Sequence, residues 1–437
     1  MFAFCRLLLL AALGYSAAVS HQLQLNESGT IIQNRMVSAG VYQMGVTKLS
    51  AVGNVRKREP ASKLQNPVIG DIYMTLTRTV QIGTPPQPIT LSVDTGSSDI
   101  WVNPTCSTSG WNTFCVKYPR FDRTKSSTFQ PTTQALNLAY GIGQVTGAYG
   151  IDNFLMAPGP TIKHLQFGVA TSSKSLFAGI MGMSWGLGLG TGYYNIVDQL
   201  ALQGITKTRA FSMDLGNVDT ASGSIIFGGV DTKKYYGSFS KNAIIPFYNS
   251  PDGFPRVLLK SGSRYWINMT SVSVRLDGQT QDSAITSPSF SLAIIMDSGS
   301  TLSYFPPSLV NAMLAYFPGY VAKGGGLYTV PCSFKTGMGT MNFGFNGQII
   351  RIPLAQFVWF NGATCYGPVA NPSEKTDAIL GDTFMRGAYV VFDQDNANVH
   401  IAQAADCGTN IVPITKGVNG VPSGVGDCPV PVATRSS

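Results

Sequence analysis

The chain has 437 residues, of which 44% are hydrophobic and only 12% charged, and its formal net charge is +8. It is long enough to form two domains and too apolar to be an intrinsically disordered protein. Its 48 Gly and 25 Pro residues, spread among short apolar runs, argue against helical bundles and coiled coils and favour an all-β, enzyme-sized protein.

The positive charge is concentrated near the N-terminus. Residues 1–58 hold six Lys or Arg and one acidic residue, which leaves 24 basic and 21 acidic residues in the rest of the chain. Because no basic stripe with interleaved aromatic residues lies outside this leader, we expect no nucleic-acid partner.

Residues 1–20 have the pattern of a secretory signal peptide. Arg6 precedes an apolar run from 7 to 13, and small residues follow it up to Ser20. This run is too short to span a bilayer, and the C-terminal end lacks the hydrophobic tail that a lipid-anchor signal requires. We therefore expect a secreted, extracellular protein without membrane attachment.

A polar stretch follows the signal and ends in the dibasic pair Lys57-Arg58. In an exported protein such a pair indicates proteolytic processing, so we predict that 21–58 is the pro-segment of a zymogen. A solvated charge run without further function is the alternative.

Six of the seven cysteines follow the predicted signal, as expected for disulfides in an oxidising compartment. Six cysteines allow many pairings, and proximity in the sequence favours Cys106–Cys115, Cys332–Cys365 and Cys407–Cys428. Without a Cys-x-x-Cys pair, and with only His164 and His400 beyond the leader, we expect no metal and no cofactor. Asn268 starts an Asn-Met-Thr glycosylation acceptor.

The chain contains two distant copies of one pattern. Asp-Thr-Gly-Ser-Ser occupies 94–98 and Asp-Ser-Gly-Ser-Thr occupies 297–301, and each lies between two apolar runs. A weaker repeat follows each copy, at 178–182 and 378–382. The repetition predicts two homologous lobes, each with the same crossing of strands around its loop.

Most other segments indicate strands separated by turns, such as 223–229 and 387–393. Two short helices are expected, at 196–203 before Gly204 and at 308–316 before Pro318.

Two such loops can perform acid–base chemistry if the lobes pack about a pseudo-twofold axis, because Asp94 and Asp297 would then face each other. Two carboxylates in contact cannot both ionise, so one pKa falls, the other rises, and the pair supplies a base and an acid at one pH. Such a pair can activate a bound water for attack on a peptide carbonyl.

The neighbouring loop residues suit this role. Gly96 and Gly299 let the backbone approach and donate N–H groups to the carboxylates, and Ser97 and Ser300 can orient the outer carboxylate oxygens. We include Thr301, which follows in the second loop, among the residues that line the substrate site.

These features resemble the pepsin-like aspartic endopeptidases, in particular secreted fungal enzymes of the candidapepsin and yapsin kind. The resemblance runs from about residue 73 to 402 and includes Ile-Gly-Thr-Pro-Pro-Gln at 82–87 and Ile-Leu-Gly-Asp-Thr-Phe-Met-Arg at 379–386. It implies a bilobal, all-β fold with a cleft between the lobes, Asp94 and Asp297 as the catalytic pair, and polypeptide substrates. We expect an N-terminal lobe at 59–240, a C-terminal lobe at 241–410, a tail at 411–437, and a monomer.

The resemblance also implies a hairpin flap over the cleft, at 139–147. It places Tyr140, Gly141 and Ile142 above the scissile bond, with the Tyr140 hydroxyl bonded to the indole N–H of Trp101. An ordinary surface hairpin is the alternative.

With Ile142, Phe177 and Ile180 as pocket walls, we expect a preference for hydrophobic side chains beside the cleaved bond. We also expect the basic pro-segment to act as an intramolecular inhibitor at neutral pH, with a Lys such as Lys48 paired to the ionised dyad. Lys48 as a solvated surface residue is the alternative.

Two rival functions remain open. Gly-Met-Ser-Trp-Gly at 182–186 fits the nucleophile elbow of serine esterases, with Ser184 as nucleophile and His400 as the only plausible base after it. The second rival is an inactive aspartic-protease-like binding protein.

Overall fold

The structure is a computed structural model that describes residues 35–50, 71–75, 80–109, 112–141, 143–187, 191–217, 222–245, 264–337, 339–422 and 424–430. The predicted signal, the Lys57-Arg58 pair and Ile142 lie outside the described residues.

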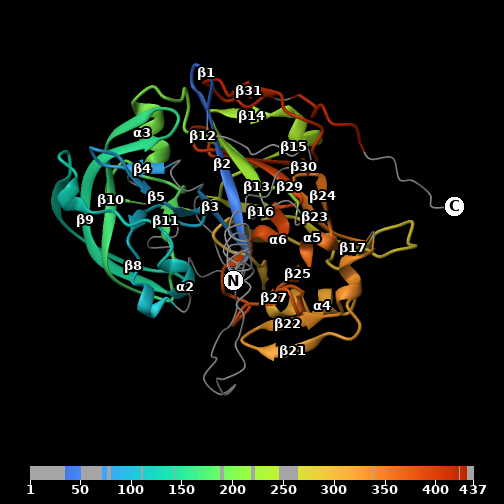
Figure 1. Cartoon of the computed structure of the whole chain (residues 1–437). Coiled ribbons are helices and arrows are strands. Elements are labelled where there is room, and N and C mark those ends of the chain that lie inside the picture. The colour runs from blue at the N-terminus through green and yellow to red at the C-terminus, as the bar shows by residue number, and fades with distance from the viewer. Residues whose placement is uncertain are drawn as a thin grey trace, which may run out of the picture.

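Strands dominate the molecule, as expected, and they form two lobes joined by one large sheet (Figure 1). Strands of the N-terminal half lie on the left in Figure 1 and those of the C-terminal half on the right, with β2 running between them. From one edge to the other, the large sheet contains β15 (Tyr235–Ala243), β30 (Asn398–Ala404), β29 (Ala388–Asp393), β12 (Ala210–Asp214), β13 (Ser222–Phe227), β2 (Val41–Ser50), β3 (Asp71–Thr75), β6 (Leu91–Asp94), β11 (Gly179–Gly182), β7 (Ile100–Val102), β10 (Thr161–Lys174), β9 (Gln144–Met156), β4 (Val80–Ile82) and β5 (Gln87–Ile89), with β1 (Arg35–Ser38) on β2 and β8 (Gln130–Ala139) on β9.

Smaller sheets complete the C-terminal half. They contain β16 (Trp266–Met269), β19 (Leu292–Met296), β28 (Ala378–Leu380), β20 (Tyr304–Phe305) and β27 (Val369–Ala370); then β18 (Ser283–Ala284), β17 (Ser271–Arg275), β23 (Thr340–Phe345) and β24 (Gln348–Pro353); then β21 (Val321–Gly324), β22 (Leu327–Val330), β26 (Cys365–Tyr366) and β25 (Trp359–Phe360); and finally β14 (Gly229–Asp231) and β31 (Ile411–Pro413). The described α-helices are α2 (Asn112–Cys115), α3 (Ile196–Leu202), α4 (Pro307–Leu314), α5 (Leu354–Phe357) and α6 (Asp382–Met385).

The repeat predicted from the sequence corresponds to a repeated order of strand pairing in the two halves. In the N-terminal half, β6 is parallel to β11, β11 is antiparallel to β7, and β7 is parallel to β10. In the C-terminal half, β19, β28, β20 and β27 follow the same sequence of parallel, antiparallel and parallel pairings. Each lobe therefore builds the same crossing of strands around its Asp loop, and the prediction is confirmed.

The two expected helices are present with slightly different bounds. The Asn195 side chain accepts hydrogen bonds from the Val197 and Asp198 backbone N–H groups and so caps the start of α3. The helix ends before Gly204, whose φ of +71° suits a residue without Cβ. Helix α4 begins one residue earlier than expected, at Pro307, because proline has no backbone N–H and its fixed φ fits the first turn.

Residues 41–50, which belong to the predicted pro-segment, form a central strand of the large sheet. β2 pairs with β13 on one side and β3 on the other. Val41, Tyr42, Met44 and Val46 are at most 1% exposed, and the Tyr42 hydroxyl donates to the Met156 carbonyl at 3.0 Å. This strand therefore contributes a substantial share of the core between the lobes.

Parts of the predicted tail pack onto the body of the protein. β31 pairs with β14, and Ile414 and Val421 are buried in a cluster with Tyr235 and Tyr389. The predicted disulfides are all present, at Cys106–Cys115, Cys332–Cys365 and Cys407–Cys428, and the last of them closes this segment. Within the described part of the chain, no helix is both long and apolar enough to cross a bilayer.

We expect Tyr42→Ala to lower the free energy of unfolding of the unprocessed chain by about 3 kcal/mol, because it leaves a cavity and removes a buried hydrogen bond. Met36→Ala is the matched control, because Met36 of β1 is 43% exposed, and its effect should stay within about 0.5 kcal/mol. Urea unfolding followed by tryptophan fluorescence measures both. Equal effects would show that β2 is not part of the core.

Candidate active site

The two Asp loops leave equivalent positions in the two lobes. Asp94 is the last residue of β6, and its carbonyl accepts a hydrogen bond from the Met183 N–H at 2.8 Å. Asp297 follows β19 directly, and its N–H donates to the Leu380 carbonyl at 3.0 Å. A neighbouring strand thus fixes the backbone of each aspartate.

Hydroxyl groups connect the two loops across the axis between the lobes. The Thr95 Oγ1 accepts from the Ser298 N–H at 2.9 Å, and the Ser298 Oγ accepts from the Thr95 N–H at 3.1 Å. Each hydroxyl also donates to a carbonyl of the other lobe, Thr95 to Met296 and Ser298 to Val93. Both side chains are buried, so this reciprocal set of four bonds is shielded from water. Serine in the second loop supplies the hydroxyl that the arrangement needs.

Glycine is required where the loops meet. A Cβ on Gly96 would lie 2.4 Å from the carboxyl carbon of Asp297, and one on Gly299 would lie 2.5 Å from Asp94 Oδ1. These clashes show that each carboxylate lies directly against the glycine of the opposite loop. The structure therefore brings together the two aspartates that the sequence separates by 203 positions.

The two carboxylates receive unequal hydrogen bonds. Asp94 accepts from the Gly96 N–H at 2.8 Å and from the Ser97 hydroxyl at 2.5 Å. Asp297 accepts from the Gly299 N–H at 2.8 Å, but the Ser300 hydroxyl donates to the Leu302 carbonyl instead. The expectation that Ser300 orients the outer oxygen of Asp297 is wrong, because its side chain turns back along its own loop. Asp94 thus accepts one side-chain hydrogen bond within its own loop that Asp297 lacks.

Asp297 is the carboxyl group of the pair whose pKa is raised. Desolvation by the surrounding protein and the adjacent Asp94 carboxylate raise the pKa of Asp297 from its usual 3.8 to about 7, against the opposing effects of the Gly299 N–H and the Arg264 cation. Two adjacent carboxyl groups of this kind can share one proton over the acidic range.

The predicted flap is a hairpin of β8 and β9. Its turn is closed by a hydrogen bond from the Tyr140 N–H to the Gly143 carbonyl at 2.9 Å, and Gly143 has a φ of +98°. The Trp101 indole N–H donates to the Tyr140 hydroxyl at 2.8 Å, as the sequence predicts. Gly141 faces open space. Burial and the nearby Asp94 raise the pKa of Tyr140, so its hydroxyl stays neutral beside the dyad.

Comparisons with known proteins agree with this geometry. The family model described as "Eukaryotic aspartyl protease" matches residues 75–404. The chain belongs to the eukaryotic aspartyl protease family. It is 31% identical over 380 residues to the probable aspartic-type endopeptidase opsB of Aspergillus oryzae, covering 82% of this chain and 73% of that protein. It is 33% identical over 347 residues to the aspartic proteinase yapsin-3 of Saccharomyces cerevisiae, covering 74% and 65%. The crystal structure of the aspartic proteinase from Irpex lacteus shares the fold, with a TM-score of 0.61, 22% identity, and coverage of 83% of this chain and 98% of that one.

Ile180 of this aspartyl protease lies on β11, which pairs with β6, the strand that ends in Asp94. Ile180 is 8% exposed and packs in one cluster with Trp101 and the flap Tyr140. Thr301 follows the second Asp loop, and its carbonyl accepts from the Thr383 N–H at 3.0 Å. Ile180 thus packs beside the flap tyrosine, and its role as a wall of a substrate pocket stays a prediction.

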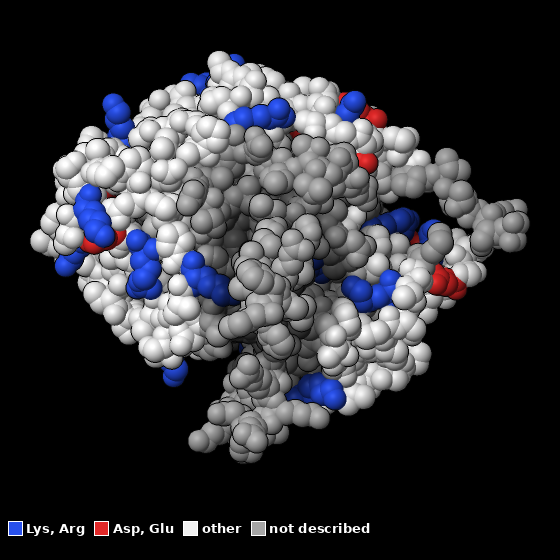
Figure 2. Space-filling view, viewed as in Figure 1, with Lys and Arg blue, Asp and Glu red and all other residues white. Residues whose placement is uncertain are grey.

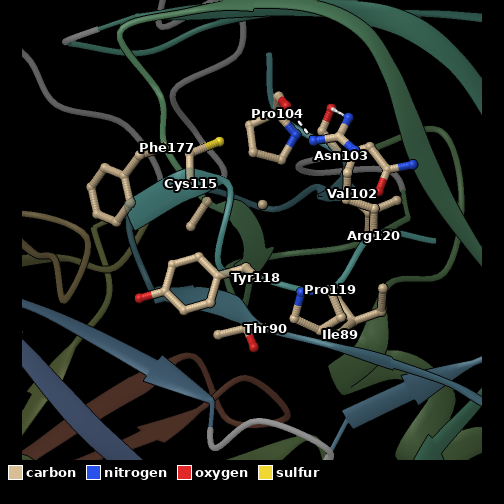
Figure 3. Close-up of a pocket in the computed structure, with 12 residues that line it drawn as sticks. Ile89, Thr90, Val102, Asn103, Pro104, Cys115, Tyr118, Pro119, Arg120 and Phe177 are labelled. Atoms are coloured by element: carbon tan, nitrogen blue, oxygen red, sulfur yellow. Dashed lines mark hydrogen bonds between the residues drawn. The ribbon is translucent and has the colours of Figure 1, made fainter. Parts of the chain in front are cut away.

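Phe177, another predicted wall, belongs to a different hydrophobic cluster from Ile180. It contacts Cys115 and Ala178 beside the Cys106–Cys115 disulfide. On that side lies a small hollow of about 10 Å³, enough for roughly one water molecule (Figure 3). Arg120 closes the hollow opposite Phe177 by donating to the Pro104 carbonyl at 2.7 Å. The residues around the hollow thus help to stabilise the N-terminal lobe.

The structure of this protease removes the basis of the serine-esterase alternative. Ser184 is fully buried, and its carbonyl accepts from the Asn195 and Gln394 side-chain amides. His400 lies on β30, where its Nε2 is 3.9 Å from a carboxylate oxygen of Asp393. A buried serine cannot attack an external substrate.

Asn268, the predicted glycosylation site, lies half-buried on β16, and its side-chain oxygen accepts from the Ser291 hydroxyl at 2.8 Å. On the face shown in Figure 2, the described Lys and Arg residues are scattered over both halves of the molecule.

We expect Asp297→Asn to reduce the pH dependence of stability. The folded protease keeps a proton on Asp297 up to a pKa of about 7, whereas the unfolded chain loses it near 3.8, so the wild type loses stability as pH rises through this interval. Melting temperatures between pH 4 and 7 should fall less steeply in the variant.

Some slope should remain in that variant, because burial raises the pKa of Asp214 to about 6. Asp122→Asn is the control. Its hydrogen bonds from Thr124 hold the pKa of Asp122 below its usual value, so its contribution is lost only below about pH 4. An unchanged slope in Asp297→Asn would contradict the assignment.

Proposed function

We propose that this aspartyl protease is a secreted, monomeric endopeptidase that hydrolyses peptide bonds at acidic pH, with Asp94 and Asp297 as its catalytic residues. The observation that carries the proposal is the pair itself. Two carboxylates from different lobes lie against each other's glycines, and the reciprocal bonds of Thr95 and Ser298 hold their loops together. Its polypeptide substrates would lie in the cleft between the lobes.

The unequal hydrogen bonding supports a different proposed role for each carboxylate. Asp94 takes a proton from a bound water, and the water oxygen forms a bond to the peptide carbonyl carbon while Asp297 donates its proton to the carbonyl oxygen. In the resulting gem-diol, one hydroxyl returns a proton to Asp297, Asp94 protonates the nitrogen, and the C–N bond breaks. The dyad then holds one proton again. The aspartic-protease dyad is the standard example of two carboxylates that share a proton.

This chemistry requires acidic conditions. The reactive state holds a single proton, which is lost as pH rises through the raised pKa of Asp297, about 7. The flap would close Tyr140 over the peptide and exclude bulk water. Ile180 offers an apolar wall beside it, which supports a preference for hydrophobic side chains at the cleaved bond.

We also propose that the enzyme is made as a zymogen and processed after Arg58. Support comes from β2, which places part of the predicted pro-segment inside the large sheet, with Lys48 half-buried near its end. Lys48 would pair with the ionised dyad at neutral pH, and protonation of the dyad would weaken that attraction. We propose that Asn268 carries a glycan.

We expect Asp94→Asn and Asp297→Asn each to reduce hydrolysis of denatured haemoglobin at pH 4 by at least about 1,000-fold, because either change removes the acid–base pair. Asp122→Asn should retain activity, since Asp122 lies at the protein surface. A statine-type transition-state analogue should block the wild type. If the processed wild type cleaves nothing, the protein is instead an inactive binding protein.

We expect the precursor purified at pH 7 to be inactive and to gain activity within minutes to hours of transfer to pH 4. Lys48→Ala should shorten this delay, whereas Lys174→Ala, at an exposed position, should leave it unchanged. Timed assays with gel electrophoresis measure both. A precursor that is fully active at pH 7 would show that the pro-segment does not inhibit.

A further inference from the structure

Asp99 connects three segments of the N-terminal lobe. Its Oδ1 accepts a hydrogen bond from the Tyr149 hydroxyl at 2.6 Å and another from the Tyr193 hydroxyl at 2.8 Å. Asp99 lies five positions after Asp94, Tyr149 lies on β9, and Tyr193 precedes α3. The two tyrosine rings also contact each other edge to face, with centroids 5.5 Å apart.

The surroundings of this carboxylate are mostly apolar. Trp101, Val145 and Ile180 are buried in the cluster to which Tyr149 and Tyr193 also belong. Among the ion pairs of the described residues, none includes Asp99, so its charge is compensated by hydroxyl donors. A half-buried carboxylate needs such donors, because leaving it unbonded costs more than the bonds gain.

The donors are fixed in their neutral form. Burial first, and then the Asp99 charge, raise the pKa values of Tyr149 and Tyr193. Both hydroxyls therefore carry their protons throughout the acidic and neutral range. The backbone of Asp99 is fixed as well, because its carbonyl accepts from the Gly182 N–H at 3.0 Å and a Cβ on Gly182 would meet its nitrogen at 2.6 Å.

Asp99 and Trp101 bond to different parts of the flap hairpin. Trp101, two residues further along, bonds to Tyr140 at the tip of the hairpin, while Asp99 bonds to Tyr149 nearer its base. Tyr149 faces Gly168 of β10 and so lies where the hairpin joins the body of the lobe. The chain segment that leaves Asp94 thus contacts the flap at two points.

We propose that Asp99 is a positioning residue: together with Tyr149 and Tyr193 it anchors the base of the flap hairpin to the loop of Asp94. This anchor aligns Tyr140 with the dyad when the flap closes. This inference rests on the proposed function. Tyr193 connects the segment before α3 to this anchor. Its carbonyl accepts a hydrogen bond from the Thr191 hydroxyl, and it lies two residues before the capping Asn195.

The test compares Asp99→Asn, Tyr149→Phe and Tyr193→Phe with the matched control Asp152→Asn. Asp152 is a buried carboxylate on the hairpin strand β9, and like Asp99 it accepts from two hydroxyls, those of Ser126 and Thr128, at 2.7 and 2.5 Å. Its network contacts neither Tyr140 nor the Asp94 loop. A purely structural role of Asp99 should therefore give the same changes as Asp152→Asn.

We expect Tyr149→Phe and Asp99→Asn to raise KM for a hydrophobic peptide and the dissociation rate of a statine-type inhibitor about tenfold, the equivalent of one charge-assisted hydrogen bond. The pH at which activity is lost on the alkaline side should stay unchanged, because the dyad is intact. The effect of the double variant should be smaller than the product of the two single effects, because both changes act on the same bond between Asp99 and Tyr149.

Hydrogen exchange of the backbone amides from 140 to 149 gives a readout that needs no catalysis. We expect it to accelerate about tenfold in the Asp99 and Tyr149 variants and to stay at the wild-type rate in Asp152→Asn. If exchange accelerates but even the wild type cleaves no peptide, the proposed function fails and the anchoring role stands. If Asp99→Asn and Tyr193→Phe lower the melting temperature but change neither exchange nor KM relative to Asp152→Asn, the anchoring role is wrong.

Discussion

The structure depends on one electrostatic constraint, which is that two carboxylates in contact cannot both be ionised. This constraint is useful only if the contact is maintained, and the contact joins two lobes. Thr95 and Ser298 maintain it by exchanging backbone and hydroxyl hydrogen bonds across the axis between the lobes. Glycine on each loop then leaves space for the opposite carboxylate. The raised pKa of Asp297 follows from this geometry, and so does the acidic range in which we propose that the enzyme works.

The rigid and the movable parts of the site are built differently. Each aspartate is attached to a buried crossing of strands, so the dyad changes little without disturbing the core of a lobe. The flap is a two-stranded hairpin with a glycine-containing turn, and side-chain hydrogen bonds to Trp101 and Asp99 align it with the dyad. A lid that must admit a peptide and then exclude water needs this combination of a movable hairpin and fixed anchor points.

The large sheet links processing to stability. Its central strand β2 comes from the segment that we predict to be removed, and the buried side chains of that strand fill the space between the lobes. The pro-segment is thus part of the folded precursor as well as a proposed inhibitor. The segment after Cys407 has a comparable role at the edge of the sheet, where its disulfide and β31 cover the cluster around Tyr235 and Tyr389.

The sequence alone predicted the β-rich class, the two lobes, the pair Asp94 and Asp297 and the bond between Tyr140 and Trp101, because repeated patterns and a family resemblance indicate these features. It favoured the observed disulfide pairs through their proximity in the sequence, without excluding other pairings. It did not determine which way Ser300 turns, where Phe177 packs, or that β2 belongs to the central sheet. Tyr149 and Tyr193 also carried no signal, since they lie 50 and 94 positions from Asp99 and meet it only after folding. Tertiary structure decided these points, because hydrogen bonds between distant side chains depend on how strands pack, and packing leaves no periodic trace in the order of residues.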